Sequence, residues 1–476
     1  MPPFSLLFAA SLSAAALAAV PGGGRGRGSD GVPVWARGGS LYAGLLADEA
    51  AAGGAYGNST PNVLAQPVDH NDASAGTFAQ RWFVDWTHFS GAPTAPVLLY
   101  IGGEGPAGGT PGGFVAVQAA ALGAVIVCLE HRYYGSSLPG AISDKALLMR
   151  TLSVEQALSD LVFFAANFTA EALGGSASQH PWVAVGGSYA GAMAAWARGR
   201  NPEVWSAAWS SSGVVEAVFR FTAFDEQVAA DISAECADAL RGITRRAEAA
   251  WAAPADRAKM LALFNAPGDL SREDFLWALA DSGAMGAQYG AKDALCAAVL
   301  PVGADPLAQF AAWTAGHYGS SFMSQCYYNT ACLSDASQSA RWPNQLPWVW
   351  QCCSQLAYWQ PGDFPGALRS AFVTTDYFTA QCQAAFASPG LVANTTGFNA
   401  VHGGKDSSAT KVVALAGSDD PWQGACVNHS TPAKQVFYAQ ARCDGCGHCG
   451  DLSASANPAL QAQHDLIAAK MKEWVA

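Results

Sequence analysis

Three residue types that are far apart in this sequence, a serine, an acid and a histidine, could together carry out acyl transfer. Ser188 follows the apolar run 182–185 and two glycines, and a stretch of small residues begins directly after it. This is the pattern of a nucleophile elbow, a tight turn between a strand and a helix that exposes the serine hydroxyl. Ala190 and then Gly191 stand where the G-x-S-x-G pattern has its second glycine, and alanine is small enough for the turn. Ser188 is therefore the candidate nucleophile, although small residues at such turns also serve ordinary packing.

A serine hydroxyl becomes a good nucleophile only when a base removes its proton and a carboxylate orients that base. Both groups occur downstream: the apolar run 411–417 ends in an acidic turn with Asp420, and a Gly- and Cys-rich loop near the C-terminus contains His448. Asp419 competes with Asp420 for the acid's role, and aspartate before proline is an ordinary turn former. The order serine, acid, histidine is nevertheless that of hydrolases with a nucleophile elbow. We expect Ser188, Asp420 and His448 to form a catalytic triad.

Acyl transfer also needs hydrogen-bond donors for the oxyanion of the tetrahedral intermediate. One donor is expected to be the backbone N–H of Tyr189, the residue after the nucleophile. The second is expected in the glycine-rich loop 102–105, which follows an apolar run, and either Gly103 or Glu104 could supply it. Glycines at strand ends also form ordinary turns, so this expectation depends on the elbow.

The elements around these residues predict an α/β protein. Between residues 66 and 215 apolar strands alternate with helical stretches, the pattern of a parallel sheet with crossover helices. Strand patterns vanish from 216 to 375, resume at 411–417, and give way to a closing helical stretch at 458–475. We therefore expect an α/β-hydrolase fold, with a mostly parallel sheet flanked by helices and a helical cap inserted between the nucleophile and acid segments.

The segment expected to form the cap shows helical periodicity. Apolar residues recur near helical spacing at Val228, Ile232, Cys236 and Leu240 and predict a helix. Ser271 opens a further helix, with Asp274 at the capping-box position.

The N-terminus predicts a secretory signal peptide, because its apolar core is too short to span a bilayer and Ala-Leu-Ala at 16–18 resembles a cleavage site. A Gly/Arg-rich stretch that follows reads as a flexible leader. The predicted division of the chain is a signal peptide at 1–18, a leader at 19–40, the first part of the hydrolase domain at 41–215, the cap at 216–375, and the second part of the hydrolase domain at 376–476.

The chain also resembles the Pro-Xaa carboxypeptidase family of serine peptidases, which includes prolyl carboxypeptidase, dipeptidyl peptidase II and the thymus-specific serine protease. The LEHRYYG and GGSYAG blocks look most similar to the thymus-specific branch. The resemblance spans most of the chain and rests on the blocks QPVDHND and TFAQRW near 66–82, LLYIGGEGP at 98–106, ALGAVIVCLEHRYYGSS at 121–137, LSVEQALSD at 152–160, VGGSYAGAMAAWAR at 185–198, GFNAVHGG at 397–404, GSDDPW at 417–422 and GHC at 447–449.

The resemblance implies a serine exopeptidase that acts on peptides next to proline, and it places Ser188, Asp420 and His448 on the family's nucleophile, acid and base. Members of the family remove either a C-terminal residue or an N-terminal dipeptide, so the resemblance leaves open which terminus is held. A charged residue of the predicted cap would pair with that terminus. The candidates are Arg220, Asp225, Glu226 and Arg341.

Twelve cysteines and four Asn-x-Ser/Thr acceptors, at Asn58, Asn167, Asn394 and Asn428, favour the secretory route. Cys443, Cys446 and Cys449 have a spacing that could hold zinc or an iron–sulfur cluster, but a fourth ligand is missing. We therefore expect disulfides on both sides of His448, a free core thiol at Cys128, no metal and no cofactor.

The net charge of −12 argues against nucleic acid and anionic membrane surfaces as partners. No segment after the predicted signal peptide is apolar enough for long enough to span a membrane. The expected partners are peptide substrates and, in keeping with the resemblance, a second copy in a possible homodimer. The expected location is outside the cell or in a lysosomal or vacuolar lumen.

Two alternatives remain at this point. A lipase or esterase on the same fold would share the triad but not the LEHRYYG and GFNAVHGG blocks. A secreted glycoprotein with an inactive hydrolase fold would serve only as a binding partner, although all three triad residue types are present here.

Overall fold

A single eight-stranded sheet positions the candidate site. Its strand order is β1-β2-β4-β3-β5-β6-β7-β8, and the strands from β4 to β8 in that order run parallel, while β1 and β2 are antiparallel to their neighbours. The strands are β1 (Asn62–Pro67), β2 (Thr77–Asp85), β3 (Val97–Ile101), β4 (Val125–Leu129), β5 (Trp182–Gly187), β6 (Trp205–Ser211), β7 (Val412–Gly417) and β8 (Val436–Ala441).

The computed structural model describes residues 58–475 except 175–178, 302 and 304. The predicted signal peptide at 1–18 and leader at 19–40 lie outside the described residues. No helix within the described part of the chain is both long and apolar enough to cross a membrane.

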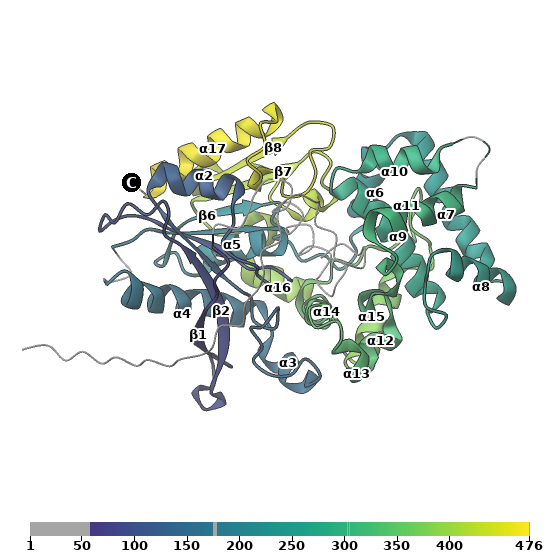
Figure 1. The fold of residues 1–476 in the computed structure, drawn as a ribbon, viewed down its shortest axis with the longest axis horizontal. Coiled ribbons are helices and arrows are strands. Elements are labelled where there is room, and N and C mark those ends of the chain that lie inside the picture. Colours follow the sequence, from purple (N-terminus) through teal and green to yellow (C-terminus); the bar gives the residue numbers. More distant parts are fainter. Residues whose placement is uncertain (1–57, 175–178, 302, 304, 476) are drawn as a thin grey trace, which may run out of the picture.

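The central strands are apolar along their whole length because both faces of the sheet are covered. Side chains alternate between the faces, so Val183 and Val185 of β5 pack on one side and Trp182 and Ala184 on the other. Helices α2 and α17 cover the first face and α4 and α5 the second, as Figure 1 shows. The carboxyl ends of the parallel strands are thereby left free for loops that carry functional residues.

Helices account for most of the remaining chain. They are α2 (Gly113–Leu122), α3 (Lys145–Thr151), α4 (Val154–Ala172), α5 (Ser188–Arg200), α6 (Thr222–Asp231), α7 (Ala234–Ala250), α8 (Pro254–Leu263), α9 (Arg272–Gln288), α10 (Lys292–Val299), α11 (Pro306–Tyr318), α12 (Thr330–Ser334), α13 (Ala336–Ser339), α14 (Gln345–Gln351), α15 (Thr375–Ala385), α16 (Thr395–His402) and α17 (Pro458–Val475).

The long excursion between β6 and β7 is helical. Its described residues form α6 to α16 and short single turns, with one isolated β-bridge between Val218 and Ala357. Figure 1 shows α6 to α13 gathered to one side of the sheet, joined to it through α14, α16 and connecting segments. The boundaries 216 and 375 for a separate cap stay a prediction.

Two helices of this excursion begin at a serine whose side chain accepts a hydrogen bond from a backbone N–H of the first turn. Ser271 precedes α9 and accepts a hydrogen bond from the N–H of Asp274, as the sequence predicts. The apolar spacing across Ile232 does not mark one continuous helix, because α6 ends at Asp231 and the Ser233 hydroxyl caps α7. A serine that binds a backbone N–H two or three residues later favours a new helix start over continuation.

Four disulfides are present among the described residues, and the other four cysteines are not disulfide-bonded. The disulfides join Cys236 to Cys296, Cys326 to Cys332, Cys353 to Cys382 and Cys443 to Cys446. Cys128, Cys352, Cys426 and Cys449 are buried thiols, which confirms the expectation for Cys128.

Candidate active site

Ser188 lies in a strained turn between β5 and α5. Its φ is +57°, in the left-handed region that non-glycine residues rarely adopt. A Cβ on Gly186 would come within 2.3 Å of the Ala190 carbonyl oxygen, and one on Gly191 within 2.6 Å of the Ser211 carbonyl oxygen. The close approach of α5 to the strand ends therefore requires the glycines that surround Ser188, which is the physical reason for the sequence pattern.

Asp420 and His448 meet in the interior although 28 residues separate them. The Asp420 Oδ1 atom is 2.8 Å from the His448 Nδ1 atom, and both side chains are fully buried. Asp420 follows β7 and also accepts a hydrogen bond from the N–H of Trp422 at 2.9 Å. Because a carboxylate only accepts, the Nδ1 atom of neutral His448 carries the proton, and the Nε2 atom then holds a lone pair.

Asp419, the alternative acid, lies elsewhere. Its carboxylate is 2.7 Å from the Lys292 Nζ atom of α10 and accepts the N–H of Gly445 at 2.7 Å. Lys292 also pairs with Asp444 at 2.5 Å. Asp419 thus ties the turn after β7 to the loop that carries His448, and Asp420 is the carboxylate that contacts the imidazole.

The backbone around His448 is fixed by residues from two other segments. The His448 N–H donates to the Gln288 carbonyl oxygen at the end of α9, at 2.9 Å. The Cys449 N–H donates to the Ser212 hydroxyl after β6, also at 2.9 Å. The expectation of disulfides on both sides of His448 is wrong on one side, because Cys449 is a buried thiol that takes part in none of the four disulfides. On the other side Cys443 and Cys446 are joined to each other, and the bridge occupies two of the three sulfurs that a metal site would need.

The electrostatics of this pair favour a charged imidazole. Burial lowers the pKa of His448, but the nearby Asp420 carboxylate outweighs it, so the pKa of His448 is raised well above its ordinary value of 6.5.

A cavity next to Ser188 lies between the sheet and the helical excursion, and residues of both line it. Ser188 and Glu104 line it from the hydrolase side, together with Trp422 of the turn after Asp420. The His448 ring lies against Tyr289 and Trp422, with centroid distances of 6.2 and 6.4 Å. Much of the remaining lining is aromatic: Phe224, Trp277, Tyr289, Tyr327, Tyr328, Trp348, Tyr358, Trp359 and Phe378.

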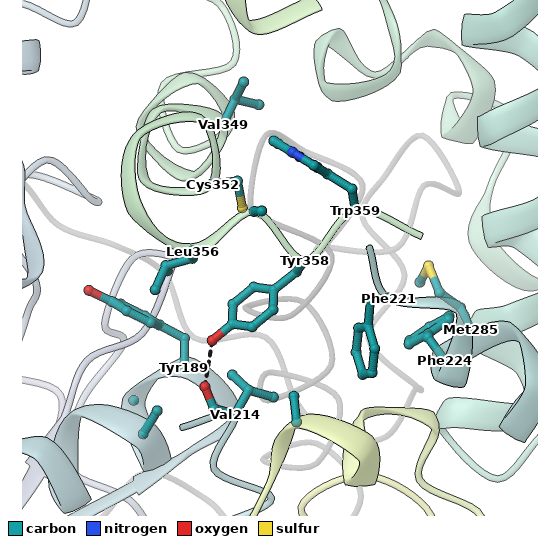
Figure 2. Close-up of a cluster of buried hydrophobic side chains, with 14 of the residues drawn as sticks. Tyr189, Val214, Phe221, Phe224, Met285, Val349, Cys352, Leu356, Tyr358 and Trp359 are labelled. Atoms are coloured by element: carbon teal, nitrogen blue, oxygen red, sulfur yellow. Dashed lines mark hydrogen bonds between the residues drawn. The ribbon is translucent and has the colours of Figure 1, made fainter. Parts of the chain in front are cut away.

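Figure 2 shows part of this aromatic wall. The Tyr358 ring lies close to the Tyr189 side chain, and its hydroxyl donates to the Val214 carbonyl oxygen. Phe221 and Phe224 stand on the other side of the Tyr358 ring. Val214 and Tyr358, which follow β6 in the chain, thus lie next to Tyr189 in the first turn of α5.

The expected oxyanion donors also lie near the cavity. Tyr189 is in the first turn of α5, directly after Ser188, and its side chain is buried. Gly103 and Glu104 follow β3, and the Glu104 side chain lines the cavity. The sequence drew attention only to the backbone of Glu104. Its carboxyl group was missed, although an acid between glycines at the end of a buried strand is a signal that could have found it.

The four residues expected to hold a substrate terminus do not line the cavity. Arg220 pairs with Asp363 at 2.7 Å on the surface. Asp225 is buried, where it accepts the N–H of Leu368 and lies 3.3 Å from Arg369. Glu226 and Arg341 are exposed.

The four glycosylation candidates differ in accessibility. Asn394 and Asn428 are exposed. Asn58 and Asn167 are half-buried, and their amides donate to the carbonyl oxygens of Val84 and Phe163.

The fold and the site define the class of protein. A mostly parallel sheet with a serine elbow after β5, an acid after β7 and a histidine after β8 is an α/β-hydrolase. The chain belongs to the serine carboxypeptidase S28 family, whose model matches residues 66–467. It is a serine-type peptidase, which decides against the esterase alternative.

Individual relatives agree with this assignment. The chain is 30% identical to the thymus-specific serine protease of Mus musculus, with 87% of each protein covered. It is 29% identical to the "Probable serine protease EDA2" of Arabidopsis thaliana, over 81% of this chain and 80% of that protein. A "Probable extracellular serine carboxypeptidase" of Arthroderma benhamiae is 33% identical over 36% of this chain and 25% of that protein.

Gly417, the last residue of β7, provides a test of how tightly the acid and histidine segments are held together. A Cβ at this position would lie 2.1 Å from the Cys446 carbonyl oxygen and 2.3 Å from that of Gly447. Gly417→Ala is expected to push the histidine loop away from Asp420, because backbone atoms cannot yield as a side chain does. We expect kcat to fall about 100-fold, as for other displacements of catalytic groups by about 1 Å, measured by steady-state kinetics.

The matched control is Gly316→Ala on α11, where a Cβ would meet no atom within 4 Å. That change replaces glycine by the better helix former and is expected to leave kcat as it is and to stabilise the fold slightly. Equal kcat values in the two variants would contradict the tight contact at Gly417.

Proposed function

We propose that this protein is a serine exopeptidase that cleaves peptide bonds through a Ser188–His448–Asp420 triad and an acyl-enzyme intermediate. The single observation that carries the proposal is the buried contact between His448 Nδ1 and Asp420 Oδ1, beside a cavity that Ser188 lines from a strained turn. The contact fixes the imidazole tautomer that a general base needs. The membership of the chain in a peptidase family supplies the reaction class.

In the first half-reaction, the His448 Nε2 atom takes the proton of the Ser188 hydroxyl while the oxygen attacks the substrate carbonyl carbon. The tetrahedral oxyanion is stabilised by the N–H of Tyr189 and by one N–H from the loop after β3. The two candidates in that loop are Gly103 and Glu104, which follow β3. The imidazolium then protonates the leaving amine, the C–N bond breaks, and Ser188 carries the acyl group.

In the second half-reaction, a water molecule replaces the leaving amine. His448 takes a proton from this water, the hydroxide attacks the ester carbonyl, and the ester bond to Ser188 breaks. The proton returns from His448 to the serine oxygen. Asp420 stays ionised throughout and stabilises the imidazolium that forms twice in each cycle.

The preference for a bond next to proline is supported by the cavity wall. Tyr358, Trp348 and Trp359 present aromatic faces to the cavity that Ser188 lines. Aromatic faces can pack against the apolar pyrrolidine ring of proline. The helical excursion supplies most of this wall, so it restricts the cavity on the side away from the sheet and favours short substrates or chain ends.

We also propose that the protein works outside the cell or in an oxidising lumen. Four disulfides among the described residues need an oxidising compartment to form. A relative is named as extracellular, and Asn394 and Asn428 are exposed acceptors for glycans.

The nucleophile is tested with a fluorophosphonate probe followed by mass spectrometry of the labelled peptide. We expect the label on Ser188. A label on another serine, or none on a folded protein, would refute the triad.

The reaction is tested with a peptide library in which proline stands at varied distances from either end. We expect cleavage near one terminus and next to proline. Cleavage in the middle of long peptides would refute the exopeptidase assignment, and cleavage without regard to proline would refute the preference.

A further inference from the structure

A second acidic group shares the cavity with the nucleophile. Glu104 is 6% exposed and lines the cavity together with Ser188. Its Oε2 atom is buried and has no hydrogen-bond partner among the described residues. A buried carboxylate without a donor is costly, so a group that donates to it from the cavity would be bound favourably.

The nearby hydroxyl groups cannot serve Glu104, because their protons are directed elsewhere. The Tyr134 hydroxyl donates to the Gln351 Oε1 atom at 2.5 Å, and Tyr358 donates to the Val214 carbonyl oxygen. Both hydroxyls lie within electrostatic reach of the Glu104 carboxylate.

Tyr189, the third hydroxyl near Glu104, is also committed. The His131 Nδ1 atom lies 2.7 Å from the Arg132 carbonyl oxygen and must therefore donate, which leaves the Nε2 atom to accept from the Tyr189 hydroxyl at 3.1 Å. Burial lowers the pKa of His131 to about 4, so the ring is neutral. The Tyr189 oxygen in turn accepts from the Gln351 amide at 2.6 Å. None of these three hydroxyls donates to Glu104, so its Oε2 atom is open to a donor that a substrate brings into the cavity.

The charges around the cavity show which substrate group fits. Its lining includes two acids, Glu104 and Asp281, and no lysine or arginine among the described residues. Asp281 is already paired with the buried Arg369 at 2.6 Å and accepts the Tyr328 hydroxyl. A free carboxylate terminus would face these acids and would find no lysine or arginine in the lining, whereas an ammonium group would meet the Glu104 Oε2 atom, which has no hydrogen-bond partner among the described residues.

We propose that the Glu104 carboxylate binds the free ammonium group at the N-terminus of the peptide substrate, so that this enzyme removes residues from the N-terminal end. The inference rests on the proposed function, because it places the scissile bond at Ser188. An ammonium group has three N–H donors and can satisfy the Oε2 atom that no protein group reaches. The distance between Glu104 and Ser188 then decides which peptide bond, counted from the N-terminus, is cleaved.

Burial raises the pKa of Glu104 to about 7, against the opposing effects of its own backbone N–H and of nearby His448. A bound ammonium group removes part of this burial cost and favours the ionised carboxylate. The carboxylate and the ammonium group therefore stabilise each other in a site that water does not fully solvate.

The test compares free and blocked N-termini on the same scissile bond. The substrates are Pro-, Gly-Pro- and Gly-Gly-Pro-aminomethylcoumarin with free and with acetylated N-termini, and a parallel series with alanine in place of proline. At the chain length that spans the distance from Glu104 to Ser188, we expect the free peptide to exceed its acetylated form about 10- to 100-fold in kcat/KM, the range for one charge-assisted hydrogen bond.

The variant Glu104→Gln keeps the shape of the side chain and removes its charge. We expect the ratio of free to acetylated kcat/KM to fall about 10- to 100-fold, and taking the ratio within one variant cancels general damage to the site. Glu171→Gln is the matched control, because Glu171 is exposed on α4 and outside the cavity lining. The ratio should stay at the wild-type value in this control.

Three results would overturn the proposal: an unchanged ratio in Glu104→Gln, equal cleavage of free and acetylated peptides by the wild type, or a preference for free C-terminal carboxylates over their amides. In each of these cases Ser188 would still react with the fluorophosphonate. Absence of that labelling would instead refute the proposed function, and the N-terminal assignment with it.

Discussion

Replacing Ser188 by alanine is expected to abolish fluorophosphonate labelling and to lower kcat by about 10⁴- to 10⁶-fold, with little change in KM. The variant lacks the only protein oxygen to which the proposed mechanism assigns a covalent bond with the substrate, while the cavity and the oxyanion donors remain. Alanine also relieves no steric contact at the elbow, because Gly186 and Gly191 allow the close approach of α5. The residual rate would be measured from the product formed at fixed times in assays with concentrated enzyme.

The control for this variant is a measurement of its folding stability. Ser188 has a φ of +57°, which alanine adopts about as poorly as serine, so the melting temperature should stay within a few degrees of the wild type. His448→Ala should cost about as much, and the double variant should be no slower than either single one, because the residues act as a unit. A double variant slower by the product of the two single effects would show that Ser188 and His448 act independently.

The parts of the site that the sequence predicts well are those encoded in short segments. The elbow is local: the glycines at 186 and 191 are adjacent to Ser188, and the contacts that require them are made by the turn itself and by the next strand. The parallel sheet is equally local, because buried strands read as continuous apolar runs.

The parts that the sequence left ambiguous or missed depend on contacts between distant segments. Asp419 and Asp420 are adjacent and chemically alike, and only the approach of Lys292 to one and of His448 to the other distinguishes them. That Cys449 forms no disulfide could not be foreseen either, because the pairing of cysteines depends on which backbones approach each other. The Glu104 carboxyl belongs to this group, because the Tyr134 hydroxyl donates to Gln351, far along the chain, while the Glu104 Oε2 atom has no partner among the described residues.

The helical excursion lines the cavity, and it also contacts the turn that carries Asp420 and the loop that carries His448. Gln288 at the end of α9 accepts the His448 N–H with its carbonyl oxygen and the Trp422 indole N–H with its side chain. Lys292, four residues later, bridges Asp419 and Asp444. One end of α9 and the start of α10 thus contact the acid turn and the histidine loop at the same time. The geometry of the proposed triad therefore depends on the position of the end of α9 and the start of α10.

Asp420→Asn is expected to lower kcat by about 10⁴-fold and to move the acid limb of the pH profile to lower pH. The amide can present an N–H to the His448 Nδ1 atom and so favour the wrong imidazole tautomer. In the wild type the Asp420 charge outweighs burial and raises the pKa of His448 well above 6.5. Because the base must be neutral, kcat/KM of the wild type should fall as the pH drops through that raised pKa. With the charge removed and the burial retained, the pKa of His448 drops and the limb shifts down.

The same change gives a stability measurement that does not depend on turnover. A histidine whose folded-state pKa is raised contributes stability that is fully present below its unfolded pKa of about 6.5 and is lost as the pH rises through the folded pKa. The wild type should therefore melt above Asp420→Asn by the largest margin just below pH 6.5, and the margin should shrink at higher pH. Asp420→Ala would complicate this comparison by opening a cavity, whereas Asp420→Asn keeps the volume of the side chain. A margin that grows with pH would mean that Asp420 does not stabilise a protonated His448, and the buried contact between them would then lack the charge coupling on which the proposed mechanism depends.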